Sequence, residues 1–266
     1  MKILILGAGG MLGHKVAKEL SDLNPIVPSR SEFDVTKDEI TKFKLSEHDY
    51  IINCVGGIPQ KGKTNQEMIT LNANFPRLLA RLPQRTIQIA TDCVYSGLDG
   101  GYSEISVKDP NSVYGASKAS GEVVASNMMH IRTSIIGPEL TSKQSLFEWV
   151  RNQPEGATVM GYANHRWNGV TTEAFAKVAK GIITNDLFKP TTQHLVPEDS
   201  VSKAELIRLI AKRIGRDDLN IVPQIMPNPI DRTLKTIYKE RNLAFWRAGG
   251  YAKQPRIADM IGEMGV

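Results

Sequence analysis

Residues 2–13 read KILILGAGGMLG, and this stretch decides the fold. Its aliphatic run, Ile3–Leu6, is typical of a parallel strand buried on both faces. An amphipathic stretch with Leu12, Val16 and Leu20 on one face follows the glycines. Strand, glycine turn and helix predict a dinucleotide site, because glycine lets the backbone approach a pyrophosphate and the helix N-terminus supplies N–H groups. The alternative is a tight turn without a ligand. The predicted cofactor contacts here are Gly7, Gly10, Met11, Leu12 and Gly13.

A short second strand is predicted at Ile26–Val27, followed at once by Ser29 and Arg30. An NAD site would place an acid about 20 residues after the glycines, to bind the ribose 2′-hydroxyl. No acid stands at this strand end, and arginine suits a 2′-phosphate. NADPH is therefore favoured over NADH, with a surface arginine that makes no cofactor contact as the alternative. Asp34 either caps a helix that begins near Thr36 or reaches the adenine amino group.

The next strand, Tyr50–Val55, ends at Gly56–Gly57, where glycines again allow a close approach of the backbone. Val55, Gly56 and Gly57 are therefore predicted at the cofactor. Asn72, in a helical segment before Pro76, is predicted to bond the backbone near the cofactor. A polar surface helix is the equally plausible alternative.

Strand Thr86–Ala90 runs into Thr91 and the sequence Asp92–Tyr95. Functional side chains gather at the carboxyl ends of parallel strands, so Thr91 is placed to bond a substrate oxygen. Tyr114 and Lys118 lie four residues apart, which puts both on one face of a helix. A neighbouring ammonium is expected to lower the phenol pKa from about 10 towards the range useful for general acid–base catalysis. Because Tyr-x-x-x-Lys is common by chance, an ordinary helix turn is the alternative.

The second half of the chain is less regular. The predicted elements are, in order, strand 130–136 ending at Gly137, helix 146–150, a polar–aromatic loop 162–170, helix 171–182, strand 193–196, a helix opened by a capping box at Ser202–Glu205 and stopped at Gly215, and a segment 221–256 that wraps over the substrate mouth. The predicted fold is an α/β protein with a Rossmann-type, doubly wound parallel sheet and a small interleaved C-terminal substrate lobe. The expected domains are 1–141 plus about 170–198 for the dinucleotide, and about 142–169 plus 199–266 for the lobe.

Composition narrows the function classes. Of the 266 residues, 41% are hydrophobic and 23% charged, and no apolar run approaches the ~18 residues of a membrane span. A net charge of +5 fits anionic ligands such as sugar nucleotides. Without a basic block or stacking aromatics, nucleic acid is not expected. Cys54 and Cys93 lack metal-ligand spacing, so we expect reduced thiols, no metal and a cytoplasmic protein.

Four motifs carry a family resemblance: Gly7-x-x-Gly10-x-x-Gly13, Thr91–Tyr95, Tyr114-x-x-x-Lys118 and Arg132–Thr133–Ser134. With them the chain resembles the extended short-chain dehydrogenase/reductases, and within these the dTDP-4-dehydrorhamnose reductase-like group. The resemblance implies a catalytic triad of Thr91, Tyr114 and Lys118. Tyr114 would give a proton to a keto oxygen that Thr91 also holds. Lys118 would lower the tyrosine pKa and bond the nicotinamide ribose, and the cofactor would deliver hydride.

The implied activity is reduction of a nucleotide-activated 4-keto-deoxysugar with NADPH, or with NADH. The alternatives are a nucleotide-sugar epimerase or dehydratase, in which Asp92 could serve as an acid, and a non-catalytic regulatory protein of the same fold. A homodimer stays open. The chain departs from the family at Cys93, where an aromatic residue is common, and at 166–171, where rhamnose-pathway reductases show glycine-x-proline-threonine. Trp167 could stack on a sugar or base, or pack between lobes. The predicted substrate contacts are Thr91, Asp92, Cys93, Tyr95, Trp167 and Asn168.

Overall fold

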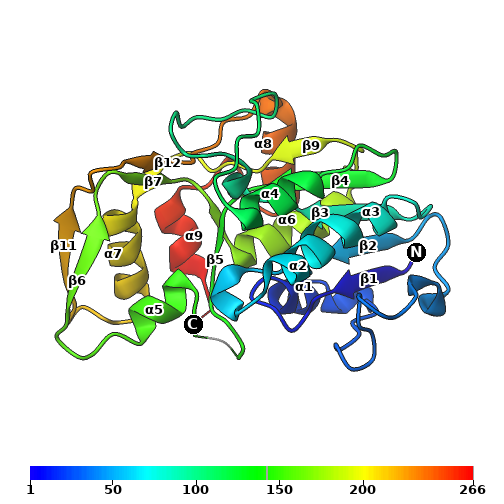
Figure 1. The fold of residues 1–266 in the computed structure, drawn as a ribbon, viewed down its shortest axis with the longest axis horizontal. Coiled ribbons are helices and arrows are strands. Elements are labelled where there is room, and N and C mark those ends of the chain that lie inside the picture. Colours follow the sequence, from blue (N-terminus) through cyan, green and yellow to red (C-terminus); the bar gives the residue numbers. More distant parts are fainter. Residues whose placement is uncertain (142, 266) are drawn as a thin grey trace.

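The computed structural model describes residues 1–141 and 143–265 (Figure 1). Residues 142 and 266, which bound the expected lobe, lie outside the described residues. Within the described ranges, no helix has the length and apolar character that a bilayer crossing requires.

A five-stranded parallel sheet forms the centre of the molecule. Its order is β1 (Ile3–Leu6), β2 (Tyr50–Asn53), β3 (Arg85–Ile89), β4 (Met128–Arg132) and β9 (Thr192–His194). The predicted α/β class with a parallel sheet is confirmed.

The prediction of a strand at Ile26–Val27 is wrong, because the structure has only a single β-bridge there, at Ile26. Ile26 N–H donates to the Ile3 carbonyl at 2.7 Å, and Ile5 N–H donates to the Ile26 carbonyl at 2.9 Å. Pro25 and Pro28 flank the bridge, and a residue without an N–H cannot extend a ladder there. The bridge lies beside β1 on the side away from β2. The chain therefore adds the bridge on one side of β1 and β2 on the other, so the order in which strands join the sheet changes direction at β1. Ligands of open α/β sheets bind at such a reversal, outside the carboxyl ends of the strands.

Alternate residues of β1 point to opposite faces, and each face has its own cover. Ile3 and Ile5 belong to the core cluster that includes α1 (Gly13–Glu19) and α6 (Thr172–Thr184). Leu4 and Leu6 pack with Phe75 and Leu79 of α3 (Phe75–Leu79). Helices therefore cover both faces, as a doubly wound sheet requires. The inward face predicted for α6 is confirmed, because its four predicted inward residues are fully buried: Phe175, Val178, Ala179 and Ile182.

The remaining elements of this half connect the strands. α2 (Asn65–Ile69) continues through a π-helical turn, Thr70–Asn74, into α3, and α4 is Val113–Ser120. α8 (Lys239–Ala248) packs on α6. The short 3₁₀ turns are Ser21–Leu23, Ile40–Phe43, Pro59–Lys61 and Asp92–Val94.

Small sheets accompany the main sheet, and those that contain β6, β7, β11 and β12 lie at the left of Figure 1. Two of these sheets have two strands: β6 (Thr158–Tyr162) pairs with β11 (Asn220–Gln224), and β5 (Ile135–Ile136) pairs with β8 (Val170–Thr171). The third has three strands, with β7 (His165–Trp167) between β10 (Val201–Ser202) and β12 (Ile230–Asp231). The helices nearby are α5 (Leu146–Arg151), α7 (Lys203–Arg213) and α9 (Ile257–Glu263). We call β6, β7, β10, β11 and β12, with α5 and α7, the small-sheet lobe.

Two predictions fail in this region. The strand predicted over 130–136 is two strands, because β4 ends at Arg132 and β5 joins a different sheet through Val170. The polar–aromatic loop predicted over 162–170 is wrong, since it contains the end of β6, all of β7 and the start of β8. The partners of these strands lie far away in the sequence, so local composition does not show them.

The helix predicted from Ser202 to Gly215 is confirmed. Of the predicted capping box, the structure has the bond from the Glu205 N–H to the Ser202 side chain. The Ser202 hydroxyl accepts the Glu205 N–H at 3.1 Å, and Gly215 follows the helix at φ +70°. The segment predicted to wrap over the substrate mouth divides in two. Residues 230–236 lie against the loop after β3, where Tyr102 N–H donates to the Thr233 carbonyl at 2.9 Å, whereas α8 packs on α6.

Candidate active site

The glycine turn is packed too tightly for side chains at two of its positions. Gly7 has φ +82°, and a Cβ there would meet the Cys54 backbone at 2.9 Å. A Cβ on Gly13 would meet the Gly7 carbonyl oxygen at 2.1 Å. Gly10 N–H donates to the same oxygen at 2.9 Å, whereas a Cβ on Gly9 would find open space. The turn is thus a backbone surface that abuts the end of β2 and is open on its outer side.

A cavity of about 720 Å³ opens over this turn, and we call it the glycine cavity. That volume lies within the range of cofactor and ligand pockets. Its lining includes half of the predicted cofactor contacts, namely Gly7, Gly10, Ser29, Arg30, Asp34, Val55 and Gly56. The lining combines glycine backbone, lysine and arginine side chains and apolar side chains, which suits a dinucleotide.

Charged groups of both signs stand at the rim of the glycine cavity. The Arg30 side chain is 78% exposed, and its Nε lies 3.8 Å from an Asp34 carboxylate oxygen. Asp34 accepts the Thr36 N–H and hydroxyl at 2.9 and 2.6 Å, so it closes a turn and caps no helix. Sequence reasoning missed Glu32, which also lines the cavity and accepts the Ser29 N–H at 2.8 Å. The rim therefore offers both an arginine and acids.

The other predicted cofactor contacts lie behind or beside the glycine cavity. Leu12 is buried in the core. Met11 lines a different cavity. Asn72 is 2% exposed; it accepts the Gly57 N–H and donates to the Gly57 carbonyl, both at 2.9 Å, and it donates to the Ser117 hydroxyl at 3.1 Å. It therefore fixes the loop after β2 to α4, and the surface-helix alternative is wrong.

The three predicted catalytic side chains converge beside the end of β3. Thr91 caps the 3₁₀ turn: its hydroxyl oxygen accepts the Cys93 N–H and donates to the Asp92 carboxylate, both at 3.2 Å. Ser112 caps α4 through the Gly115 N–H, which starts the helix one residue before Tyr114. Lys118 is buried, and its ammonium donates to the Ile89 carbonyl at 2.6 Å.

The electrostatics of this group differ from the sequence prediction. Burial raises the pKa of Tyr114 above its usual value, the neighbouring Cys93 adds to the rise, and the Thr91 hydroxyl opposes it. Burial lowers the pKa of Lys118 to about 8. The prediction that Lys118 depresses the tyrosine pKa is wrong for this arrangement, since the ammonium points to the Ile89 carbonyl. The phenol therefore holds its proton across the neutral range, as a proton donor must.

A buried ionic network stands behind Lys118. Arg132 forms a forked pair with Glu122, with Nε–Oε1 and Nη2–Oε2 distances of 2.9 and 2.5 Å. Arg132 Nη1 also donates to the Tyr95 hydroxyl and to His194 Nε2, both at 2.6 Å. Glu122 lies four residues after Lys118, just past the end of α4, and its charge opposes the fall of the lysine pKa. The network ties the chain just after α4 to β4 and β9.

Tyr95 belongs to this network, so its predicted substrate contact is wrong. The side chain is fully buried, its ring stacks on Tyr102 with centroids 4.2 Å apart, and its hydroxyl donates to the Ser103 carbonyl at 2.8 Å. Asn168 also differs from the prediction. Its amide donates to the Leu234 carbonyl at 2.7 Å and accepts the Leu234 N–H at 2.8 Å, which occupies both of its polar atoms.

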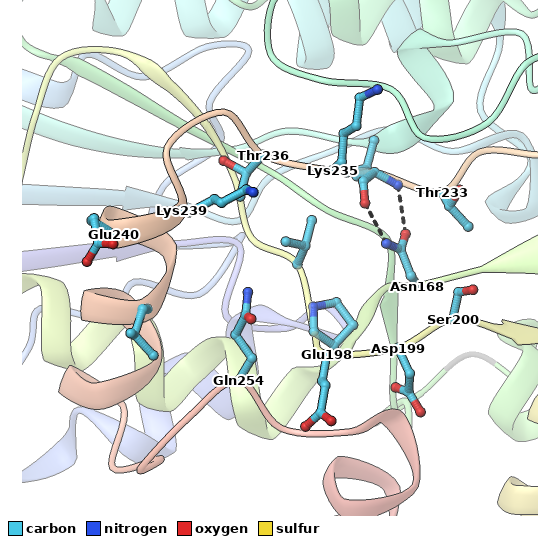
Figure 2. Close-up of a pocket in the computed structure, with 14 residues that line it drawn as sticks. Asn168, Glu198, Asp199, Ser200, Thr233, Lys235, Thr236, Lys239, Glu240 and Gln254 are labelled. Atoms are coloured by element: carbon cyan, nitrogen blue, oxygen red, sulfur yellow. Dashed lines mark hydrogen bonds between the residues drawn. The ribbon is translucent and has the colours of Figure 1, made fainter.

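Asn168 faces another cavity, of about 670 Å³, bordered by the segment 196–200 and by α8 (Figure 2). Figure 2 shows its two bonds to the backbone of the segment that follows β12, and the acids Glu198, Asp199 and Glu240 around the opening. None of the three predicted catalytic residues lines it. This cavity is therefore separate from the candidate site.

A third cavity, of about 260 Å³, lies between the glycine turn and the small-sheet lobe, and we call it the lobe cavity. Met11 and Ser134 line it from the main-sheet side, and Trp167 and Lys203 from the lobe. Lys61 borders both this cavity and the glycine cavity.

Trp167 and Lys203 connect the lobe cavity to the predicted triad. Trp167 is 3% exposed within β7, and the Lys203 ammonium lies 5.7 Å from its ring centroid. Burial raises the pKa of Asp92, and the positive charges of Lys203 and Arg232 oppose this rise. Burial and the charge of Asp92 together raise the pKa of the half-buried Cys93 to about 12. Sequence reasoning missed Lys203 because nothing local relates it to Asp92. Among the described residues, no cluster of histidine, cysteine and carboxylate side chains could hold a metal ion.

Known proteins resemble this chain in sequence and in fold. The dTDP-4-dehydrorhamnose reductase of Mycobacterium tuberculosis H37Rv is 30% identical over 136 residues, which are 46% of this chain and 44% of the relative. The enzyme of the same name from Aggregatibacter actinomycetemcomitans is 24% identical over 84% of this chain and 83% of its own. The chain thus spans less than half the length of the first curated relatives that it matches.

Solved structures share the whole fold. A dTDP-4-dehydrorhamnose reductase from Clostridium acetobutylicum superposes with a TM-score of 0.78 at 21% identity, covering 99% of this chain and 98% of the other. The Bacillus anthracis protein, solved in complex with NADP, gives 0.78 at 19% identity with the same coverage. The sequence model of the family described as the RmlD substrate binding domain matches residues 1–244, and the chain belongs to that family.

Proposed function

We propose that this protein is an NADPH-dependent reductase of a nucleotide-activated 4-keto-deoxysugar. The observation that carries the proposal is the convergence of Thr91, Tyr114 and Lys118 beside the end of β3, where the Tyr114 phenol meets the Thr91 hydroxyl and the Lys118 ammonium bonds the Ile89 carbonyl. Lys118 also lies close enough to Cys54, which lines the glycine cavity, for the two groups to interact electrostatically. Family membership supports the same reading, since several relatives carry the name dTDP-4-dehydrorhamnose reductase.

The residues of the glycine cavity fit a nicotinamide dinucleotide. The backbone of the glycine turn would hold the diphosphate, and Val55 and Gly56 would flank the ring system. Arg30 would bind a 2′-phosphate, and the Bacillus anthracis relative was solved with NADP. Glu32 could instead accept a ribose hydroxyl, which keeps NADH as the alternative. The bound cofactor would supply the hydride.

The protein's own groups would manage the proton. Tyr114 keeps its phenolic proton at neutral pH and would transfer it to the carbonyl oxygen as that oxygen gains charge. Thr91 would hold the same oxygen, which requires its hydroxyl to turn away from Asp92. Lys118, already fixed on the Ile89 carbonyl, would donate its remaining protons to the cofactor ribose and supply positive charge as the phenolate forms.

The direct experiment supplies a panel of nucleotide-linked 4-keto-deoxysugars with NADPH and with NADH. We expect stoichiometric NADPH oxidation with at least one sugar and slower oxidation of NADH. Protein that binds NADPH yet oxidises none with any sugar would contradict the proposal and favour a non-catalytic regulatory protein.

A second candidate is a nucleotide-sugar dehydratase or epimerase. The observation in its favour is Asp92, a buried carboxyl beside Thr91 whose pKa burial raises, as a proton donor needs. Such an enzyme regenerates its cofactor within each turnover. Conversion of a nucleotide sugar without net oxidation of NADPH would select this candidate over the reductase.

A further inference from the structure

The Lys118 ammonium lies among titratable groups from four other parts of the chain. Cys54 follows β2, Cys93 follows β3, His130 lies in β4 and Glu122 follows α4, and each of them interacts electrostatically with the lysine. Burial raises the pKa of both thiols to about 12 and lowers the pKa of the histidine, so these three groups are neutral at pH 7. Of the four, Glu122 is the one that carries a charge there.

Arg132 bonds both oxygens of the Glu122 carboxylate. Its Nε–H and Nη2–H donate to Oε1 and Oε2 at 2.9 and 2.5 Å, and Lys108 adds a bond to Oε2 at 3.1 Å. The Glu122 and Arg132 side chains are each 3% exposed. Burial alone would raise the pKa of Glu122, but the hydrogen bonds and the charge of Arg132 hold it below its usual value. The carboxylate is therefore ionised, and both of its oxygens already have donors.

Arg132 is fixed in turn by the neighbouring strand β9 and by the loop after β3. Its Nη1 donates to the Tyr95 hydroxyl and to His194 Nε2, both at 2.6 Å. A guanidinium has no acceptor, so His194 Nε2 accepts this bond and the Nδ1–H donates to the Lys235 carbonyl at 2.8 Å. The guanidinium cannot turn away from the carboxylate without breaking the bonds to Tyr95 and His194.

This arrangement separates the charge of Glu122 from its hydrogen bonds. A free carboxylate four residues from a lysine would pair with it and would draw the ammonium from the Ile89 carbonyl. Because Arg132 bonds both oxygens, Lys118 keeps its bond of 2.6 Å to Ile89, and its other protons remain for the cofactor. Among the neighbouring groups Glu122 still has the largest effect on the charge of the lysine, whereas Tyr114 keeps its proton and adds no charge.

We propose that Glu122 and Arg132 are positioning residues for Lys118: the carboxylate keeps the ammonium charged, and the guanidinium prevents the carboxylate from binding it. This assignment rests on the proposed function, in which Lys118 must carry its charge as the Tyr114 phenolate forms. Neither Glu122 nor Arg132 lines the glycine cavity or the lobe cavity. Their effect should therefore appear in the pH at which Lys118 loses its proton.

The test is a pH titration of Lys118 in the full chain, followed by NMR of ¹³C-labelled lysine side chains, with the signal identified by its loss in Lys118→Arg. The wild-type midpoint should lie near pH 8. Glu122→Gln should lower it by about 1 pH unit, because an opposite charge is removed, and kcat for keto-sugar reduction at pH 7.5 should then fall about 3-fold. Glu122→Asp keeps the charge and should restore both values.

A second variant tests the guanidinium. Arg132→Lys keeps the positive charge but loses the fork, so one oxygen of Glu122 becomes free to bind Lys118. The Lys118 midpoint should rise above the wild-type value, and NADPH affinity should fall about 2- to 10-fold because the ammonium is drawn from the ribose. A midpoint that falls in this variant would contradict the role given to Arg132.

The double variant Glu122→Gln with Arg132→Met serves if Glu122→Gln does not fold. It leaves neither charge of the pair buried and unpaired, and it should also lower the midpoint because the carboxylate is gone. NADPH binding by each variant shows that it is folded.

Glu148→Gln is the matched control, since Glu148 is another buried carboxylate paired with an arginine, Arg151, in α5. Its Lys118 midpoint and kcat should equal those of the wild type. A midpoint that does not move in the folded Glu122 variants would overturn the inference even if the wild type reduces a keto sugar. The expected midpoint shifts in a protein that reduces no keto sugar would support the electrostatic role and overturn the proposed function alone.

Discussion

The main sheet and the small-sheet lobe hold their functional side chains by different means. In the main sheet, five parallel strands in continuous register fix the ends of β1, β2 and β3, and the triad follows from that backbone. In the lobe, strands of two to five residues pair in sheets of two or three, and single side chains complete the joints. Asn168 binding both polar groups of Leu234 is an example. Under the proposed function, chemistry would therefore depend on the backbone of the main sheet, and recognition would depend on a lobe whose joints are completed by single side chains.

The largest expected effect is a difference in catalytic rate between a substitution in the main-sheet half and one in the small-sheet lobe. Tyr114→Phe removes the phenolic proton, so kcat for keto-sugar reduction should fall by about 10²–10⁴-fold while NADPH affinity, measured by fluorescence titration, stays. Tyr162→Phe, at an exposed lobe position on β6, is the control and should leave kcat unchanged. A Tyr114→Phe enzyme with full turnover would remove the triad from the mechanism.

A smaller effect should appear in the stability of the two halves. Glu122→Gln leaves Arg132 buried without its counter-charge, which should cost about 3–5 kcal/mol of unfolding free energy in urea titrations. Asp218→Asn breaks the exposed pair with Arg216 in the lobe and should cost far less, because solvent screens that pair. Equal losses in both variants would contradict the contrast between the halves.

The pH dependence of stability should report on Lys118. Its folded pKa of about 8 lies below its ordinary 10.5, so the unfolded chain binds more protons between these values and stability rises with pH across that window. Relative to Lys118→Met, the wild type should gain ~3 kcal/mol from pH 8 to 10.5. In the variant the Ile89 carbonyl still accepts a hydrogen bond from the Gln88 side chain, so removal of the lysine does not leave this carbonyl without a donor. Parallel pH profiles would show that the ammonium is not buried.

The smallest effect tests a joint of the lobe. Asn168→Ala leaves the Leu234 N–H and carbonyl unpaired and should cost about 1–3 kcal/mol. Hydrogen exchange should quicken over 230–236 and stay unchanged in β1–β3. Faster exchange throughout the main sheet would mean that the two halves unfold together.

Local patterns in the sequence were sufficient for the first strand, the glycine turn and the inward face of α6. The aliphatic run at 3–6, the glycine turn and the buried face of α6 each depend on residues within one or two turns, and all three are confirmed. The place of Thr91 followed from the rule that parallel strands end at one edge of the sheet, and Lys118 was singled out by its four-residue spacing from Tyr114.

The lobe and the electrostatics needed the tertiary structure. β6 pairs with β11, and β5 with β8, so their partners lie far along the chain and a polar stretch resembles a loop. Tyr95 is buried because Arg132 reaches it from β4. Lys203 meets Trp167 only after β10 pairs with β7, and no spacing in the sequence relates the two.

The place of β9 at the end of the main sheet bears on how the chain matures on the ribosome. β4 emerges early, but its outer edge stays bare until residues 192–194 have been translated, after β5, β6, β7 and β8. An unpaired strand edge is a template for association with other chains. Nascent chains stalled before Thr192 should therefore be the species that chaperones must shield.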